Sequence, residues 1–213
     1  MSYQPDAICN RDVFILIDQS GSMTKRDTEG RMRRWDSLKE QVMSHVDSIL
    51  NYEVNGVKIS NSIRISLFSR NRVKDEKFRV TDVTHVENIF IENNPDSTTF
   101  ITPTLKDCLN EWFENYNTSK TQKAIFIIYT DGQFDDTDAF EKLIQETCAK
   151  LKNDSIIKII IIGVGKEIDE EYFERLDNNT KNNVDINGNP CDILLFELAN
   201  KVENIINLIQ KEL

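Results

Sequence analysis

Histidines and paired cysteines are scarce in this sequence. Its 213 residues include two histidines and four cysteines, and no two cysteines form a Cys-x-x-Cys pair. A tetrahedral zinc site takes most of its ligands from these residue types, so the chain offers few candidates for one. We expect the thiols to be reduced and the protein to be cytoplasmic.

An excess of positive charge and long hydrophobic runs are also missing. The chain has 26 Lys and Arg residues against 36 Asp and Glu residues, which gives a formal net charge of −10. This charge opposes nonspecific binding to nucleic acid or to an anionic membrane, so we expect neither as a partner. No apolar run reaches the length of a membrane span, and residues 1–12 lack the apolar core of a signal peptide.

Hydrophobic residues are nevertheless frequent enough for a globular core, at 39% of the chain with 29% charged. The length fits one large domain, which we expect to span residues 1–213. Segments typical of strands alternate with segments whose apolar residues recur at helical spacing. The expected strands are Val13–Ile17, Ser62–Ser69, Phe78–Val83, Ala124–Tyr129, Ile156–Val164 and Cys191–Leu195. The expected helices are Trp35–Asn51, Pro103–Tyr116, Thr137–Leu151, Asp169–Leu176 and a last helix from about Leu198 to Leu213.

This alternation predicts an α/β fold with right-handed crossovers between parallel strands. We expect a doubly wound, mostly parallel central sheet of about six strands. Phe78–Val83 is the expected antiparallel edge strand, in a hairpin with Arg70–Lys77.

Oxygen-bearing side chains follow the first of these strands. Five apolar residues, Val13–Ile17, are followed by Asp18, Ser20 and Ser22, with Gly21 between the two serines. A carboxylate and two hydroxyls are hard ligands of the kind that Mg²⁺ or Mn²⁺ prefers. Open α/β sheets bind their ligands at the carboxyl ends of the strands. The sequence therefore predicts a divalent-cation site at the end of this strand.

Two other loops are expected to meet the first one. Asp131 follows the apolar strand Ala124–Tyr129, so its carboxylate is expected at the same edge of the sheet as Asp18. The loop that ends at Pro103 carries several threonines, and we expect Thr102 to supply a ligand, with Thr99 or Thr104 as alternatives. Two aspartates, two serines and a threonine form a six-coordinate oxygen shell once water fills the vacancies.

These motifs resemble the metal-ion-dependent adhesion site of von Willebrand factor type A domains. Asp18-Gln-Ser-Gly-Ser is similar to the Asp-x-Ser-x-Ser motif of that family, Thr102 to its second-loop threonine and Asp131 to its third-loop aspartate. The Ile-Ile-Gly-Val-Gly run at Ile161–Gly165 is also similar to the family pattern. The resemblance covers the chain from Asp12 onwards, and it implies the Rossmann-like fold of the family.

The resemblance further implies a protein-binding module without catalytic residues. Ser20, Ser22 and Thr102 would bind Mg²⁺ or Mn²⁺ directly, Asp18 and Asp131 partly through water, and an Asp or Glu of a partner protein would complete the shell. Two carboxylates formally neutralise the ion, so neutral hydroxyls leave it able to attract a further acidic group. The chain looks most like stand-alone prokaryotic members, whose context implies an AAA+ ATPase partner or a stress-response or conflict system.

Alternative interpretations stay open at this point. The Asp-x-Ser-x-Ser segment could be a turn with capping side chains, and Thr102 could be the N-cap of the next helix. A magnesium-dependent phosphatase or phosphotransferase is the alternative function, although no histidine lies in the three loops. The metal could also serve only to tie the three loops together.

Charged residues near the motifs suggest two smaller hypotheses. Asp135 and Asp136 are expected to cap the helix that follows them. Arg31, Arg33 and Arg34 follow the first motif, either as a solvated loop or as a rim that steers an acidic partner to the metal.

Overall fold

The computed structural model describes residues 7–69, 77–116 and 123–213. A six-stranded sheet with the strand order β5-β4-β1-β6-β7-β8 forms its centre. The strands are β1 (Asp12–Asp18), β4 (Ile63–Phe68), β5 (Lys77–Val80), β6 (Ala124–Thr130), β7 (Ile157–Gly163) and β8 (Leu194–Leu198). β5 pairs with β4 in antiparallel orientation, and the other neighbouring strands pair in parallel. The predicted fold class is confirmed.

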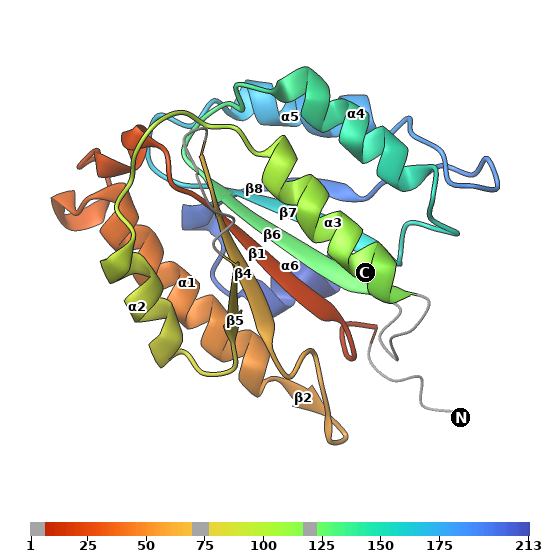
Figure 1. Cartoon of the computed structure of the whole chain (residues 1–213), viewed down its shortest axis with the longest axis horizontal. Helices are drawn as coiled ribbons and strands as arrows, with labels where there is room; N and C mark the ends of the chain where they lie inside the picture. Colours follow the sequence, from red (N-terminus) through yellow and green to blue (C-terminus); the bar gives the residue numbers. More distant parts are fainter. Residues whose placement is uncertain (1–6, 70–76, 117–122) are drawn as a thin grey trace.

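Helices cover both faces of this sheet (Figure 1). They are α1 (Arg34–Asn51), α2 (Thr84–Glu92), α3 (Thr102–Tyr116), α4 (Thr137–Cys148), α5 (Glu170–Thr180) and α6 (Ile205–Lys211). Buried residues of α1, α2 and α6 join one hydrophobic cluster, and those of α3, α4 and α5 join another. Three short 3-10 helices, η1 (Gly21–Thr24), η2 (Glu29–Arg31) and η3 (Ala199–Lys201), and a small hairpin of β2 (Glu53–Val54) and β3 (Val57–Lys58) complete the described elements.

The apolar run of β1 explains why helices cover both faces of the sheet. Ile15 and Ile17 belong to the cluster beneath α1, whereas Phe14 and Leu16 belong to the cluster beneath α3. Successive side chains of a strand point to opposite faces, so a continuous apolar run needs a helical layer on each side.

The carboxyl ends of β1 and β6 form the junction that positions the site. The two strands are neighbours, but β1 leads into α1 on one face and β6 leads into α4 on the other. Crossovers that leave adjacent strands in opposite directions open a crevice between their ends, which is where such sheets bind ligands.

Three expectations about elements are wrong. α2 was not predicted; it includes His85. Its apolar residues Val86, Ile89 and Phe90 are buried at i, i+3 and i+4, a pattern that its polar neighbours conceal. The last strand is β8, three residues later than expected, because buried Cys191 and Ile193 precede it without belonging to it.

The last helix is shorter than expected. Leu198 ends β8, where it pairs with Gly163, and α6 begins only at Ile205. The Asn204 side chain accepts hydrogen bonds from the amides of Ile206 and Asn207, which defines this start. The expected hairpin segment Arg70–Lys77 lies, apart from Lys77, outside the described residues. Within the described chain, no helix combines the length and hydrophobicity of a membrane span.

Candidate metal site

Asp18 is the last residue of β1 and is fully buried. One carboxylate oxygen accepts a hydrogen bond from the Ser20 amide at 2.8 Å, and the other accepts one from the Thr130 hydroxyl at 2.7 Å. Thr130 ends the adjacent strand β6, so this second bond joins the two strand ends. The carboxylate therefore has a fixed position at the junction.

Ser20 and Ser22 continue the oxygen cluster toward Asp131. The two serine hydroxyl oxygens lie 2.9 Å apart, and the Ser22 hydroxyl donates to Oδ1 of Asp131 at 2.8 Å. Ser20 precedes the 3-10 helix η1 and Ser22 lies within it, and the short distance between their oxygens shows that both hydroxyls point to the same place. The structure thus brings four of the five predicted site residues together.

The two aspartates influence each other electrostatically. Burial, and secondly the negative charge of Asp131, raise the pKa of Asp18 to about 6, although hydrogen bonds from Thr130 and Ser20 oppose the shift. Two buried carboxylates at one strand junction favour a cation between or beside them.

The second loop is held against the first by backbone hydrogen bonds. The Gly21 amide donates to the Ser97 carbonyl at 3.0 Å, and the Asp96 amide donates to the Gln19 carbonyl at 2.7 Å. Thr99 follows this contact by two residues and is buried. The loop therefore delivers threonine side chains next to the Asp18–Ser22 turn.

Thr102, the predicted ligand of this loop, is the first residue of α3. Its hydroxyl is buried and has no hydrogen-bond partner, so it does not cap the helix. A buried hydroxyl without a partner is unfavourable, and a bound cation within reach would satisfy it. Thr104 lies in the first turn of α3 and is half-buried.

Asp135 and Asp136 were expected to cap α4, and Asp136 does occupy the N-cap position of that helix, but without a capping hydrogen bond from its side chain. Neither side chain caps that helix; instead the Asp135 carboxylate accepts a hydrogen bond from the Thr99 amide at 2.9 Å. The Asp136 carboxylate accepts from the amides of Ile101 at 3.2 Å and Thr102 at 2.8 Å. Asp136 therefore caps α3 from a different loop, and the two aspartates tie the third loop to the second. Sequence spacing alone could not reveal a cap that comes from a remote loop.

Arg34 was expected either in a solvated loop or in a rim that steers an acidic partner, but its side chain is 1% exposed. Its guanidinium donates to Oδ2 of Asp131 at 2.8 Å and forms a two-pronged ion pair with Asp27. Asp27 and Asp131 raise the pKa of Arg34 above its usual range. Arg33 is half-exposed and pairs with Asp36 at 2.7 Å. Arg34 is thus an internal part of the site rather than a solvated steering charge.

The donor set fits a hard divalent cation. In the described ranges, no group of three or more His, Cys, Asp or Glu side chains is placed to hold a metal ion. A cation here would therefore depend on the two aspartates together with serine and threonine hydroxyls, which suits Mg²⁺ or Mn²⁺. Both histidines lie elsewhere: His45 is buried in α1 against Tyr129, and His85 is exposed on α2.

Comparisons with known proteins identify a family and structures of similar fold. The family model of the von Willebrand factor type A domain matches residues 12–190. The structure of the manganese-loaded TRAP protein of Plasmodium vivax superposes with a TM-score of 0.59 and 15% identity, over 91% of this chain and 71% of that one. The SpRpn10 VWA domain superposes with a TM-score of 0.59 and 13% identity, over 88% of this chain and 87% of that one.

A third similar structure is proximal thread matrix protein 1 from the mussel byssus, in which zinc occupies the metal-ion-dependent adhesion site (MIDAS) motif. Its TM-score is 0.53 at 16% identity, over 98% of this chain and 47% of that one. At sequence identities of 13–16%, these similarities show a shared fold and nothing further. No curated protein sequence matches the chain.

Proposed function

Because the chain belongs to the von Willebrand factor type A family, we propose that it is a divalent-metal-dependent protein-binding module. The observation that carries this proposal is the cluster of Asp18, Ser20, Ser22 and Asp131 oxygens at the β1–β6 junction. Hydroxyl and carboxylate oxygens converge there, and in the described part of the chain their recorded hydrogen-bond partners include no histidine or cysteine.

The metal would be held by Ser20, Ser22 and a second-loop threonine, with Asp18 and Asp131 supplying the negative charge. When bound, the ion offers a Lewis-acidic position that a carboxylate can occupy. Structures of similar fold are described as manganese-loaded and zinc-occupied, and the hard oxygen donors lead us to propose Mg²⁺ or Mn²⁺ for this chain. The partner would be a protein that presents an Asp or Glu side chain.

The wider context is part of the proposal. We propose that residues 1–213 act as one module in the cytoplasm, of the stand-alone prokaryotic type. As an adaptor it would serve an AAA+ ATPase or a stress-response or conflict system, which the family resemblance suggests.

Metal binding can be measured first, without any partner. Titration calorimetry with MnCl₂ and MgCl₂ should give one saturable site in the wild-type protein. Asp131→Asn should weaken it at least about ten-fold, because removing a carboxylate from a buried cation site loses a strong charge interaction. Asp138→Asn, an exposed carboxylate in the first turn of α4, is the matched control. An unchanged affinity in Asp131→Asn would reject the site.

Partner capture then tests the function. Immobilised protein should retain a protein from cell extract in Mg²⁺ and release it in EDTA, and Asp131→Asn should fail to retain it. The same partner bound equally in EDTA would contradict the proposal. Phosphate release from generic phosphomonoesters that is lost in Asp18→Asn would favour the phosphatase instead.

Replacing Ser22 by aspartate tests the role of the neutral hydroxyls. Ser22→Asp adds a third carboxylate, so it should tighten Mn²⁺ binding and reduce attraction of an acidic ligand. Ser22→Ala, which removes a ligand and adds no charge, should weaken both. Equal behaviour of the two variants would contradict the charge argument.

The threonine ligand can be identified by three single substitutions. The unpartnered hydroxyl supports Thr102, and the contact of the second loop with Gly21 supports Thr99. Replacement by valine keeps the shape and removes the hydroxyl, so the ligand should be the position whose Thr→Val variant loses about ten-fold or more in Mn²⁺ affinity. Thr104→Val is the third member of the series.

A further inference from the structure

We propose that Arg34 sets the charge of the metal site: it engages one oxygen of Asp131, loosens the hold of the protein on the metal, and leaves the metal more attractive to an acidic ligand. This inference rests on the proposed metal-dependent binding. It assigns Arg34 the role of a positioning residue, which acts through Asp131 and makes no contact with the ligand itself.

The two oxygens of Asp131 have different partners. Oδ1 accepts from the Ser22 hydroxyl at 2.8 Å, on the side of the serine turn, and Oδ2 accepts from Nη1 of Arg34 at 2.8 Å. The side chains of Arg34 and Asp131 are 1% and 0% exposed. A charge pair this deeply buried is little screened by solvent, so Arg34 withdraws part of the negative charge that Asp131 could offer to a cation.

The remaining nitrogens of Arg34 bind acids that are less buried. Nε and Nη2 donate to the two oxygens of Asp27, and Nη2 also lies 3.2 Å from Oε2 of Glu167. The Asp27 side chain is 24% exposed and the Glu167 side chain is 62% exposed. Glu167 also pairs with Lys25 at 2.6 Å. Solvent weakens these outer pairs, so they compensate the charge of Arg34 less completely than a buried acid would.

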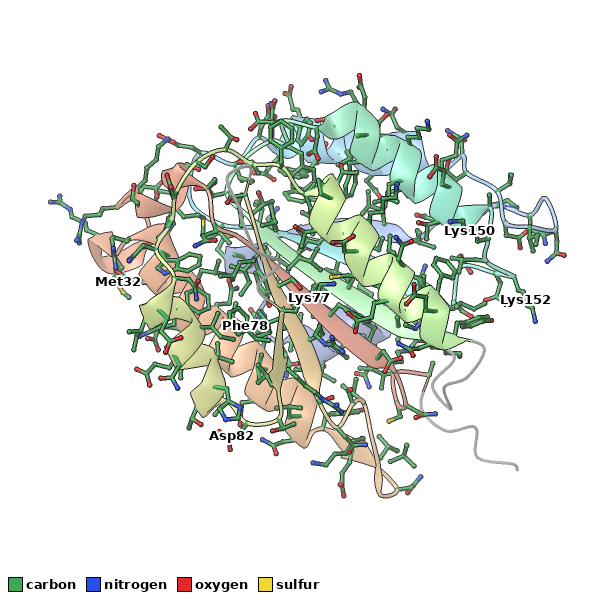
Figure 2. All side chains as sticks on the ribbon, viewed as in Figure 1. Met32, Lys77, Phe78, Asp82, Lys150 and Lys152 are labelled. Atoms are coloured by element: carbon green, nitrogen blue, oxygen red, sulfur yellow. The ribbon has the colours of Figure 1, made fainter. Side chains whose placement is uncertain are left out.

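Arg34 is also closely packed on the side that faces Gly165. Its own amide donates to the Lys25 carbonyl at 2.8 Å, and Gly165 lies directly against its side chain. A Cβ atom at Gly165 would stand 2.5 Å from Nε of Arg34, so a side chain at this position would require the arginine to shift. Met32, two residues before Arg34, is exposed (Figure 2).

Charge and positioning predict opposite effects on metal affinity. Removing Arg34 removes a cation beside the metal, which favours metal binding, but it also releases one oxygen of Asp131. The Ser22 hydroxyl still donates to the other oxygen, so the orientation of Asp131 is only partly lost. The repulsion between the arginine and the metal in a buried site is therefore the larger effect. A cation that is held more weakly by the protein keeps more of its charge for an external carboxylate. The two affinities should therefore change in opposite directions.

The test compares Arg34→Met with Arg33→Met. Mn²⁺ affinity is measured by calorimetry, and acetate binding to the Mn²⁺-loaded protein is measured from the relaxation of the acetate methyl protons. In Arg34→Met, Mn²⁺ should bind about five-fold tighter and acetate about three-fold weaker. In Arg33→Met both constants should stay within about two-fold, because Arg33 forms a partly exposed pair with Asp36.

A second variant covers the case in which Arg34→Met fails to fold. Asp27→Asn keeps Arg34 and removes one of its compensating charges, so the arginine repels the metal more strongly. Mn²⁺ should then bind about three-fold weaker and acetate should bind tighter, the reverse of the first variant.

The possible failures can be told apart. If the wild-type protein binds no Mn²⁺, the proposed function itself fails. The wild type could instead bind Mn²⁺ while Arg34→Met or Asp27→Asn changes the Mn²⁺ and acetate affinities in the same direction, or changes neither affinity. Arg34 would then only support the fold, and this inference would be overturned.

Discussion

His45 is a buried histidine outside the candidate site. It lies on α1, and its Nδ1 is 2.6 Å from the hydroxyl oxygen of Tyr129 on β6. Burial lowers the pKa of His45 to about 4. The imidazole is therefore neutral in the folded protein at pH values where it is protonated in the unfolded chain.

This difference predicts a loss of stability in mild acid. Between about pH 6.5 and 4 the unfolded chain binds a proton at this residue and the folded protein does not, so the free energy of unfolding falls as pH falls, by up to about 3 kcal/mol. Urea unfolding at pH 7.5 and 5.0 should show a smaller pH effect in His45→Gln than in the wild type. His85→Gln, on the exposed face of α2, should match the wild type. An identical pH effect in both variants would disprove the assignment.

Gly165 offers a second prediction for a single residue. Its φ of +93° and its contact with Arg34 both oppose a side chain, whereas Gly188 has a φ of +82° and nothing within 4 Å of an added Cβ. Ala substitution at Gly188 should cost about 1–2 kcal/mol of stability for the backbone conformation alone. Gly165→Ala should cost more, and it should also change Mn²⁺ affinity because Arg34 must shift. Equal costs with unchanged metal binding would show that Arg34 accommodates the methyl group freely.

At the level of elements, the third loop supports the start of α3. The Asp136 carboxylate accepts hydrogen bonds from the amides of Ile101 and Thr102. Asp136→Ala should destabilise the protein by about 1–2 kcal/mol, the usual cost of a lost helix cap. It should also weaken Mn²⁺ binding, because the threonine loop loses its attachment to the loop of Asp131. Asp138→Ala is the control, and equal melting temperatures in the two variants would refute this role.

Most elements were predictable because their signals are local. The strands β1, β6 and β7 each contain a run of four or more apolar residues, and α1 and α3 have clear apolar stripes. α2 was not predicted because its nine residues give only a short pattern of buried apolar residues among polar neighbours. The start of α6 depends on a single capping side chain, Asn204, which hydrophobic periodicity does not reveal.

The site was predictable where its residues follow the ends of strands. Parallel strands bring Asp18 and Asp131 to one edge, so topology alone places them together. The roles of Arg34 and Asp136 depend on contacts between loops that are far apart in the sequence, 97 residues in the case of Arg34 and Asp131. From the sequence, Arg34 was expected in a solvated loop or a steering rim, and Asp136 as a cap of the helix that follows it. Their actual partners depend on how the loops pack against one another, which the sequence does not show.

At the scale of the whole molecule, we expect the fold to persist without the metal. Two hydrophobic clusters, one on each face of the sheet, lie beneath the helices, and burial of apolar surface on this scale is the main stabilising term of a globular protein. The site occupies one edge of the sheet and contributes little to either cluster.

Chelation should therefore lower stability without unfolding the protein. At a free concentration about 100 times Kd, the metal adds about 2.7 kcal/mol of stability. For a chain of this size the melting temperature should fall by about 5–10 °C in EDTA. Circular dichroism and thermal melting would check this, and both should show a folded, cooperative protein without metal. Loss of tertiary structure in EDTA would instead support a metal that only ties the loops together.

The contact between Gly165 and Arg34 also has a consequence for evolution. Arg34 begins α1 and Gly165 lies in the loop after β7, and a side chain at position 165 would enter the space that the arginine fills. Among relatives of this chain, we expect the two positions to vary together: larger residues at position 165 should occur where position 34 is no longer arginine. Such relatives would have lost the cation beside their metal site, and they should prefer less acidic partners.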